Sequence, residues 1–473
     1  MLKLPSHFVE YIQTILPDPL SITEFEAACQ QPLRRAIRVN TLKTTIPDFL
    51  ALVTSWGWQC DPIPWCEAGF WLQRPDESKP LGNTWAHLAG LFYVQEASSM
   101  LPVSALLTQQ PVPYLVLDMA AAPGSKTTQI AALMQHEGCL VANEYAASRL
   151  KSLHANVQRL GVRNVALTHF DAAVFGDYCT EVFDAILLDA PCGGEGTVRK
   201  DERALADWSL DHIHELASLQ QGLLESAFRA LKVGGSLVYS TCTLNQIENQ
   251  QVCYALKNTF GHAVVFDSLE DLFPGAERAL TPEGFLHVWP QIYNSEGFFV
   301  AKITKQAPVV ASSRRRRAIT NKSPWQVVPH AEIQQLDAYF KTQFGCVPSE
   351  YGTVMQRQDE YWLWPNAIAA VQGLVRFDRI GIRLAKRLKK GFKAEHEAVM
   401  ALPLAVDQTL ALDAKAAEQY LMGRDIAMSS SFLSTEVAVS YQGAVLGLGK
   451  ILPAKLKNQL PRHLVRDRIH LDG

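Results

Sequence analysis

The sequence predicts a doubly wound α/β fold, in which a parallel sheet is covered by helices on both faces. Apolar strand-like runs alternate with helical patterns along residues 112–303. The run at residues 183–189 is almost continuously apolar, as expected for a strand that is buried on both faces. A tight turn of small residues follows the first run, at the point where such sheets bind nucleotide-like ligands. We therefore expect a Rossmann-like sheet in the middle of the chain.

The elements of this sheet follow from local patterns taken in chain order. Strands are short apolar runs between turn residues, and helices are longer stretches with apolar residues at helical spacing. Gly234 and Gly235 turn the chain from the longest helix into the next strand. Strands are expected at residues 114–118, 138–143, 165–169, 183–189, 236–241 and 297–303, and helices at 126–134, 147–160, about 210–231 and 245–257.

The segments on either side of the sheet have a different character. Residues 8–15 have the pattern of a short amphipathic helix, and residues 34–43 are basic. The Trp-rich and Pro-interrupted residues 56–71 are typical of short strands and turns. On the C-terminal side, residues 383–390 have a basic, helix-like pattern and residues 443–450 indicate a glycine-rich strand pair.

Length and composition narrow the class of protein. The 473 residues are enough for two to four domains, and 48% hydrophobic with 19% charged residues is typical of a soluble globular protein. The nine cysteines form no C-x-x-C pair, which argues against a disulfide scaffold or a zinc module and favours a reducing compartment. The sequence contains no signal-peptide pattern and no long apolar run. We expect a cytoplasmic protein with no membrane segment and no metal.

Charge is distributed unevenly along the chain. Residues 306–473 carry 23 Lys and Arg against 15 Asp and Glu, a balance of +8, whereas the preceding 305 residues carry 21 against 32, a balance of −11. A basic C-terminal third beside an acidic body is typical of a protein that contacts a polyanion. The same composition also fits a solvated basic surface, and charge alone does not decide between the two.

The first strand leads into a loop of small residues, Asp118-Met-Ala-Ala-Ala-Pro-Gly124-Ser-Lys126. Small residues let a ligand approach the backbone at the carboxyl edge of the sheet. The loop has only one glycine, so it matches neither the G-x-G-x-x-G loop of dinucleotide enzymes nor a P-loop. It therefore indicates a nucleotide-like ligand of another kind.

Acidic residues follow the next three strands. Glu144 could accept both hydroxyls of a ribose, Asp171 could accept from an adenine amino group, and Asp189 ends the fourth strand. Any one of them is more often an ordinary capping or loop residue. Their recurrence at one edge of the sheet indicates a binding site.

Two cysteines also follow strands at this edge, in Asp189-Ala-Pro-Cys192 and Ser240-Thr-Cys242-Thr. A single cysteine after a strand is usually a small buried apolar residue, but two at one cofactor edge call for a chemical explanation. Methylation of carbon 5 of cytosine needs a thiolate that adds to carbon 6, an acid near N3, and a base that later removes the proton from carbon 5. Cys242 and Asp189 fit the first two roles, although local chemistry allows either cysteine to attack.

These motifs resemble those of the Fmu/Sun family of RNA cytosine-5 methyltransferases. The resemblance covers roughly residues 1–305, in the blocks 38–43, 93–100, 118–127, 189–192, 240–243 and 297–301. It implies a class I methyltransferase sheet and S-adenosyl-L-methionine as cofactor. In the family, the Thr-Cys cysteine attacks carbon 6, which corresponds to Cys242, and the Pro-Cys cysteine, Cys192, assists breakdown of the covalent adduct. Lys126 would face the target nucleotide. The cofactor contacts of the family fall on Ala120, Ala121, Ala122, Pro123, Gly124, Ser125, Lys126, Glu144, Asp171 and Asp189.

The sequence departs from the family at two places. Gly193 follows the Pro-Cys cysteine where Ser is usual, and residues 287–291 are His-Val-Trp-Pro-Gln where an Arg and then Pro-His are usual. Three alternatives remain at this point. An amino-group methyltransferase would need an Asn/Asp-Pro-Pro-aromatic corner, a DNA cytosine-5 enzyme would use the Pro-Cys cysteine alone, and a non-catalytic RNA-binding factor would need neither cysteine.

The length and the basic C-terminal extension are most similar to the family members that methylate a decoding-region cytosine, position 1407, of 16S ribosomal RNA in the small subunit. This implies an N-terminal RNA-binding extension (1–105), a methyltransferase domain (106–305), a linker (306–325) and a β-rich, PUA-like RNA-binding region (326–473) that can divide into two subdomains. We expect a monomer whose partner is ribosomal RNA. His396, between two glutamates, is expected to be a structural or surface residue and not a metal ligand.

Overall fold

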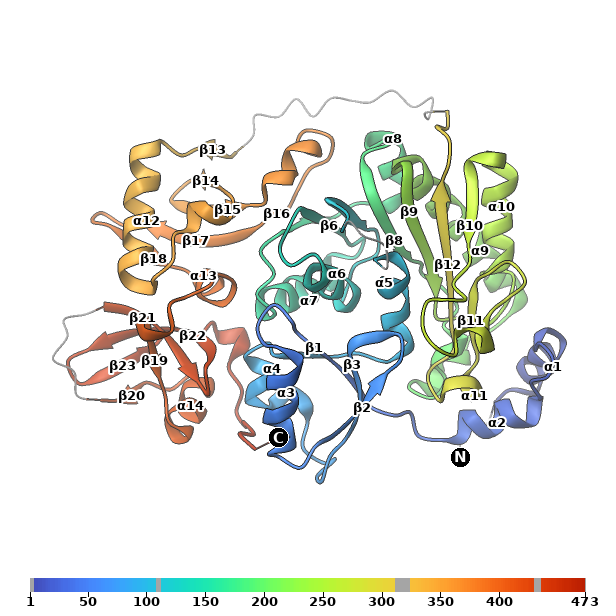
Figure 1. The fold of residues 1–473 in the computed structure, drawn as a ribbon, viewed down its shortest axis with the longest axis horizontal. Coiled ribbons are helices and arrows are strands. Elements are labelled where there is room, and N and C mark those ends of the chain that lie inside the picture. Colours follow the sequence, from blue (N-terminus) through green and yellow to red (C-terminus); the bar gives the residue numbers. More distant parts are fainter. Residues whose placement is uncertain (1–3, 108–111, 311–323, 429–434, 473) are drawn as a thin grey trace.

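The computed structural model describes residues 4–107, 112–310, 324–428 and 435–472. In Figure 1, the central sheet extends from the middle to the right, the two C-terminal sheets lie on the left, and the small N-terminal sheet lies at the bottom centre. The central sheet is mixed and doubly wound, which confirms the predicted fold class. Within the described ranges, no helix has the length and apolar character that crossing a membrane requires.

The central sheet has the strand order β10-β12-β9-β8-β5-β6-β7-β16, with β11 paired to β12. The strands from β9 to β7 in this order are parallel, and β12 and β10 add antiparallel strands at one side. Because β5 lies between β6 and β8, the chain order reverses beside β5, and a crevice opens at the carboxyl ends of the strands there. The bounds are β5 (Leu115–Asp118), β6 (Cys139–Asn143), β7 (Val165–Thr168), β8 (Phe183–Asp189), β9 (Leu231–Thr241), β10 (Val264–Asp267), β11 (Leu286–Val288), β12 (Phe298–Lys305) and β16 (Arg379–Ile380).

Helices cover both faces of this sheet, as the apolar runs predict. In β5, Val116 belongs to one apolar cluster and its neighbour Leu117 to the other. The first cluster includes residues of α5 (Leu101–Leu106), α6 (Ser125–Leu133) and α7 (Ala147–Arg159), and the second includes residues of α9 (Leu210–Ala230) and α10 (Gln250–Phe260). The strand ends are therefore held rigidly between two layers of helices.

Two expected boundaries near the end of the sheet are different in the structure. Strand β9 begins at Leu231 and not at residue 236, because its first residue already pairs with Phe183 across a bulge. Helix α10 begins at Gln250 and not at residue 245. The residues before it form turns, in which the Glu248 N–H donates to Oδ1 of Asn245 (2.8 Å). These turns place buried polar side chains beside the end of β9.

The helix expected at residues 383–390 was wrong, because β17 (Ile382–Arg387) is a strand in this segment. Ile382 and Leu384 alternate into an apolar cluster, and the strand pairs with both of its neighbours. His396 was expected to be either a structural or a surface residue. It is buried at the start of α13 (His396–Ala401) and is therefore structural.

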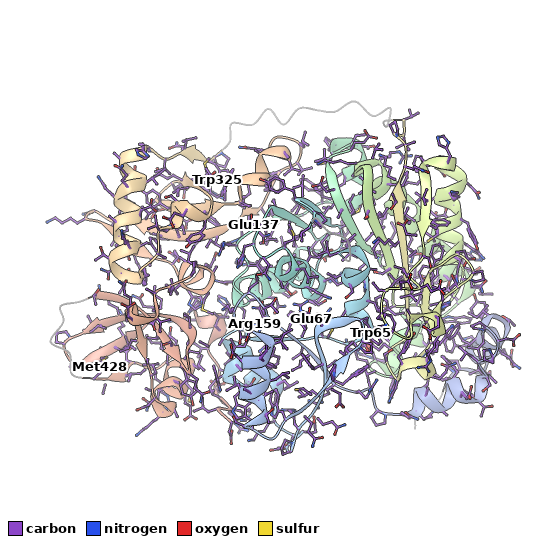
Figure 2. All side chains as sticks on the ribbon, viewed as in Figure 1. Trp65, Glu67, Glu137, Arg159, Trp325 and Met428 are labelled. Atoms are coloured by element: carbon purple, nitrogen blue, oxygen red, sulfur yellow. The ribbon has the colours of Figure 1, made fainter. Side chains whose placement is uncertain are left out.

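The N-terminal sheet has the order β2-β3-β1-β4, and its β2–β3 hairpin agrees with the short strands and turns expected in residues 56–71. Buried Arg38 joins this sheet to the start of α6 by donating to the Ser125 carbonyl (2.7 Å) and to Oγ1 of Thr128 (2.8 Å). Arg159 of α7, labelled in Figure 2, donates to the His87 carbonyl (2.7 Å). The bounds are α1 (Ser6–Ile15), α2 (Ile22–Gln30), α3 (Ile46–Thr54), α4 (Trp85–Leu88), β1 (Ala36–Val39), β2 (Gln59–Ile63), β3 (Cys66–Gln73) and β4 (Phe92–Val94).

The C-terminal part forms two five-stranded sheets, and the strand pair expected near residues 443–450 is the β21–β22 hairpin. Of the expected linker, 306–325, residues 311–323 lie outside the described residues. The remaining elements are α12 (His330–Phe344), α14 (Ala414–Leu421), β13 (Gln326–Val327), β14 (Thr353–Arg357), β15 (Glu360–Trp364), β18 (Phe392–Ala394), β19 (Thr409–Ala411), β20 (Ile426–Ala427), β21 (Thr435–Tyr441), β22 (Ala444–Leu452) and β23 (Lys455–Asn458).

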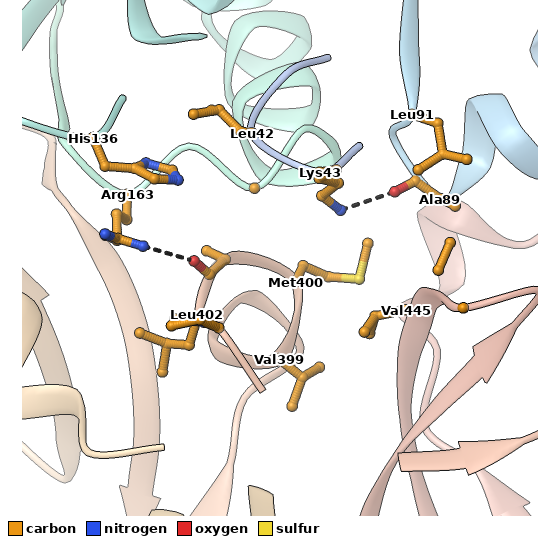
Figure 3. Close-up of a pocket in the computed structure, with 15 residues that line it drawn as sticks. Leu42, Lys43, Ala89, Leu91, His136, Arg163, Val399, Met400, Leu402 and Val445 are labelled. Atoms are coloured by element: carbon orange, nitrogen blue, oxygen red, sulfur yellow. Dashed lines mark hydrogen bonds between the residues drawn. The ribbon is translucent and has the colours of Figure 1, made fainter. Parts of the chain in front are cut away.

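The C-terminal part is attached directly to the central sheet. Strand β16 pairs antiparallel with β7 and extends the sheet. All parts also meet around a cavity of about 240 Å³, shown in Figure 3, where Arg163 donates to the Ala401 carbonyl (3.4 Å) and Lys43 donates to the Ala89 carbonyl (2.8 Å). The basic C-terminal region is thus fixed on the side of the sheet that carries β7.

Candidate active site

A cleft of about 550 Å³ lies at the carboxyl ends of β5 to β8, where the chain order of the sheet reverses. Its volume is within the range of small-molecule sites, ~300–1,000 Å³. The cleft brings together five of the residues predicted to contact a cofactor, which are Ala120, Ala122, Glu144, Asp171 and Asp189. Apolar side chains of Leu219 and Leu223 line it as well. Apolar walls with acidic groups at the edge suit an adenosine, with its flat base and its ribose hydroxyls.

Buried Asp118 anchors the loop between β5 and α6. Its Oδ2 accepts a hydrogen bond from Oγ1 of Thr127 (2.7 Å), and burial raises the pKa of this carboxyl group to about 7. Gly124 precedes α6 with φ 106°, a left-handed conformation that favours glycine. The loop can therefore present its small residues, with their backbone groups, to the cleft.

The two acids that follow β6 and β7 differ in their surroundings. Glu144 is buried and accepts hydrogen bonds from the backbone N–H groups of Ala122 (3.3 Å) and Ala146 (2.8 Å), and its Oε2 lies 3.6 Å from Nη1 of Arg149. Asp171 is exposed at the rim and accepts from the Ala173 N–H (3.0 Å). Glu144 thus fixes the cofactor loop, while Asp171 stands at the opening.

A second cavity, of about 300 Å³, adjoins the cleft and shares Ala120, Ala122, Arg149 and Asp189 with it. Ala121, Pro123, Ser125 and Lys126, predicted as cofactor contacts, line this second cavity and not the cleft. Cys242 lines it too, whereas Gly124 lines neither space. The site therefore has two compartments with Asp189 on their common wall.

Asp189 and Lys126 form an ion pair on this wall, with 2.7 Å between Oδ2 and Nζ. The other oxygen of Asp189 accepts from Oγ of Ser240 (2.7 Å), and Lys126 also donates to Oγ of Ser99 (3.0 Å). Burial lowers the pKa of Lys126, but Asp189, together with Cys242 and Asp118, outweighs this effect and the net shift is upward. Lys126 is therefore protonated, and its positive charge interacts favourably with a thiolate at Cys242.

The two cysteines predicted from their motifs lie together. Sγ of Cys192, after β8, is 3.3 Å from Sγ of Cys242, after β9, and both side chains are half-buried. The hydrogen bond to Cys242 and burial hold the pKa of the Cys192 thiol well above its usual value. The neutral thiol of Cys192 thus contacts the sulfur of Cys242, which lines the second cavity.

Two buried glutamates that sequence reasoning missed hold the cysteine loops in place. Glu195 accepts from Oγ1 of Thr243 (2.7 Å) and from the Leu244 N–H (3.0 Å). Glu248 accepts from the Gly193 N–H (3.0 Å) and from Nε2 of Gln220 (2.7 Å), and burial raises its pKa. Both glutamates lie close in sequence to the cysteine motifs, which is the one signal that could have drawn attention to them. Among the described residues, no group of three or more His, Cys, Asp or Glu could hold a metal ion.

Comparison with known proteins agrees with this arrangement along nearly the whole chain. The family model described as 16S rRNA methyltransferase RsmB/F matches residues 105–304. The model for the N-terminal domain of 16S rRNA methyltransferase RsmF matches residues 4–97. Two further models match the C-terminal part: the pre-PUA domain of ribosomal RNA small subunit methyltransferase F at residues 325–402, and the methyltransferase RsmF PUA domain at residues 407–466.

Individual relatives give the same result. Proteins named ribosomal RNA small subunit methyltransferase F are 55% identical over 467 residues in Aeromonas salmonicida, covering 98% of both chains, and 57% identical over 473 residues in Shewanella loihica, covering 99% of this chain and 97% of the relative. A methyltransferase homologue from Pyrococcus horikoshii has a solved structure with TM-score 0.52 and 34% identity, over 64% of this chain and all of that one. NSun6 from the same organism, at 23% identity and TM-score 0.55 over 64% of this chain and 98% of its own, shows the shared fold.

The fold, the cofactor cleft and these relatives define an S-adenosyl-L-methionine-dependent methyltransferase that acts on ribosomal RNA. The chain belongs to the ribosomal RNA small subunit methyltransferase F family, a branch of the Fmu/Sun enzymes, and its C-terminal region is of the PUA-like type.

Proposed function

We propose that this enzyme methylates carbon 5 of a cytosine in the decoding region of 16S ribosomal RNA, position 1407, through a covalent bond between Cys242 and carbon 6 of the base. The observation that carries the proposal is the 3.3 Å contact between the sulfurs of Cys192 and Cys242 at a cavity shared with Asp189 and Lys126. An amino-group methyltransferase would have no use for two thiols at this place.

The first step is addition of the Cys242 thiolate to carbon 6 of the base. The sulfur–carbon bond forms, the electron pair of the ring double bond moves towards carbon 5, and negative charge develops around N3. The Lys126–Asp189 pair lies on the wall of the same cavity and can hold a proton at N3. Carbon 5 thereby becomes a nucleophile.

The cofactor would occupy the neighbouring cleft, with its adenosine between the loop 120–122, Glu144 and Asp171. When it is bound, S-adenosyl-L-methionine supplies an electrophilic methyl group. Asp189 and Ala120 line both compartments, so the two spaces are joined at the place where carbon 5 and the methyl donor must meet.

Release reverses the addition. A base removes the proton from carbon 5, the electron pair restores the ring double bond, and the bond between carbon 6 and the Cys242 sulfur breaks with departure of the thiolate. Cys192 is the group placed to assist this step, because its thiol contacts the leaving sulfur and can donate a hydrogen bond or a proton to it. The family resemblance assigns attack to Cys242 and release to Cys192, and the contact between the two sulfurs supports this division.

Access to the site requires the target base to leave its stack, because Cys242 lies inside a cavity. We assign RNA binding to the N-terminal extension (1–105) and to the basic region 326–473, with residues 106–305 as the catalytic domain and 306–325 as the linker. Phosphate contacts by Lys and Arg side chains position RNA without recognising its sequence. We also propose that the protein is a monomer, holds no metal, and acts in the cytoplasm on small ribosomal subunits.

The direct test is a map of 5-methylcytosine across total RNA from cells with and without this protein. The expected result is loss of one methylated cytosine in the decoding region, restored by the wild-type gene and not by Cys242→Ala. Purified protein, labelled cofactor, naked 16S RNA and isolated small subunits then identify the form of the substrate. If no methylated cytosine is lost, the proposal fails.

A further inference from the structure

The cavity that contains Cys242 has an acidic wall with no role in the reaction as described so far. Glu96, which follows β4, and Glu296, which comes shortly before β12, both line this space of about 300 Å³. The wall lies in the same compartment as the Lys126–Asp189 pair. A base that enters the cavity therefore meets the carboxyl groups of Glu96 and Glu296 as well as that of Asp189.

Glu296 is held close to the nucleophile by the backbone. The Gly196 N–H donates to the Cys242 carbonyl (2.9 Å), and the Gly297 N–H donates to the Gly196 carbonyl (3.0 Å). The contact between the two glycines leaves no room for a side chain, because a Cβ atom on Gly196 would lie 2.2 Å from the Gly297 oxygen. The segment that carries Glu296 is thus packed directly against the loop after Cys192.

Among the carboxyl groups of this cavity, Glu296 is the one with an unused oxygen. Both oxygens of Asp189 accept hydrogen bonds, from Lys126 and Ser240. Glu96 accepts from the Ser99 N–H (3.2 Å) and from the Glu296 N–H (3.2 Å). Glu296 is only 4% exposed, and its Oε1 has no hydrogen-bond partner within the described part of the chain. A buried acceptor without a donor is costly, so a missing ligand is the natural partner.

The electrostatic surroundings leave Glu296 able to ionise near neutral pH. Burial and the neighbouring Glu96 raise the pKa of Glu296 to about 7, and the cations that face it, Lys200, Arg199 and Lys126, act in the opposite direction. A donor group that enters the cavity favours the ionised form further, because a carboxylate accepts hydrogen bonds more strongly than a carboxylic acid.

We propose that the Glu296 carboxylate accepts a hydrogen bond from the exocyclic amino group of the target cytosine and thereby excludes uracil. The inference rests on the proposed function, because it takes the target base to lie in the Cys242 cavity. Cytosine presents an N–H donor at carbon 4, whereas uracil presents a carbonyl oxygen that would face the carboxylate. Glu96 acts as a positioning residue, since its carboxylate accepts the backbone N–H of Glu296.

The test compares two small-subunit or RNA substrates that differ only in cytosine or uracil at the target position. Wild-type enzyme is expected to methylate the cytosine substrate and to reject the uracil substrate. Glu296→Gln is expected to raise KM for cytosine and lower kcat/KM by ~10–100-fold, and to accept uracil better, because an amide can donate to the carbonyl at carbon 4. Glu296→Ala should lose cytosine efficiency without gaining uracil. Glu277→Gln, at an exposed glutamate of the same domain, is the matched control and should leave both values unchanged.

The pH profile gives a second measurement that a merely structural role would not change. With Glu296 ionised in the productive complex, kcat/KM for cytosine rises with pH through about 7. Glu96→Gln removes the like charge, so the part of the rising limb that belongs to Glu296 should move to lower pH, and in Glu296→Gln that part should be lost. If wild-type enzyme forms no 5-methylcytosine, the proposed function fails. If wild-type enzyme is active while both Glu296 variants keep its cytosine-to-uracil ratio and its pH profile, this inference alone is overturned.

Discussion

Glu195 and Asn245 are joined by two hydrogen bonds, one from the Asn245 backbone N–H (3.0 Å) and one from its side-chain amide (3.1 Å). Glu195 belongs to the loop that carries Cys192, and Asn245 to the loop that carries Cys242. Glu195 and Asn245 are both fully buried. A buried polar network behind the two sulfurs therefore ties together the loops that carry them.

Removing the Glu195 carboxylate should destabilise the protein. The Glu195 carboxylate also accepts hydrogen bonds from Nε1 of Trp208 (2.6 Å) and Oγ1 of Thr243 (2.7 Å). Glu195→Ala therefore leaves several buried donors without a partner. We expect the free energy of unfolding to fall by ~3–5 kcal/mol, as measured by denaturant titration. Glu202→Ala, at an exposed position nearby, should cost less than ~0.5 kcal/mol. A loss below ~1 kcal/mol for Glu195→Ala would show that the network does not hold the loops.

Lys126 should matter for chemistry more than for cofactor binding, because its side chain lines the Cys242 cavity and not the cofactor cleft. Lys126→Met removes the cation beside Cys242 and leaves Asp189 without its ion-pair partner. Single-turnover methyl transfer should slow by ~100-fold or more. The Kd for S-adenosyl-L-methionine, measured by calorimetry, should stay within ~3-fold of wild type. The reverse pattern would place Lys126 among the cofactor contacts.

Glu144 and Asp171 should affect cofactor affinity to different degrees. Glu144 is buried and also holds the backbone of the loop after β5, so Glu144→Gln should lose the proposed ribose contact and loosen that loop. We expect the Kd for the cofactor to rise by ~10–100-fold. Asp171 is exposed and competes with water, so Asp171→Asn should change the Kd by less than ~10-fold. Equal effects of the two variants would contradict the assigned geometry.

Asp118 should make stability depend on pH. Burial raises its pKa in the folded protein to about 7, far above that of an exposed aspartate. Between about pH 4 and 7 the folded protein holds a proton that the unfolded chain releases, so this contribution to stability is lost as the pH rises. Asp118→Asn keeps an acceptor for Thr127 but cannot ionise. From pH 5 to 7.5, the unfolding free energy of the variant should gain at least ~1 kcal/mol relative to wild type, and a constant difference would refute the assignment.

The central sheet could be predicted from the sequence because its strands are continuous apolar runs. Residues 183–189 were expected as a strand, and β8 has these bounds. Strand β16 could not be predicted in this way, because it has two residues and depends on pairing with β7. The segment 383–390 was expected to be helical because of its charged residues, but in β17 its apolar residues alternate and its neighbours supply the hydrogen bonds.

The candidate site was predicted where a motif carries its chemistry and missed where tertiary packing supplies it. Cys192 and Cys242 follow strands and Asp189 ends one, so the three residues meet at one edge of the sheet, as expected. Glu296 and Glu248 belong to no motif with a chemical reason, and their importance lies in what surrounds them. An unpaired Glu296 oxygen in the cavity that Cys242 also lines, or a carboxylate that accepts from the Gly193 N–H, becomes visible only when distant segments are brought together.

The division of labour between the cysteines is the central claim, and the covalent adduct tests it most directly. Cys192→Ala and Cys242→Ala are each incubated with substrate RNA and S-adenosyl-L-methionine, and the products are resolved by denaturing electrophoresis and intact mass. Cys192→Ala should accumulate a protein–RNA adduct that carries the transferred methyl group, and its turnover should be reduced. Cys242→Ala should form neither adduct nor 5-methylcytosine. Turnover by Cys242→Ala, or an adduct formed through Cys192, would contradict the account.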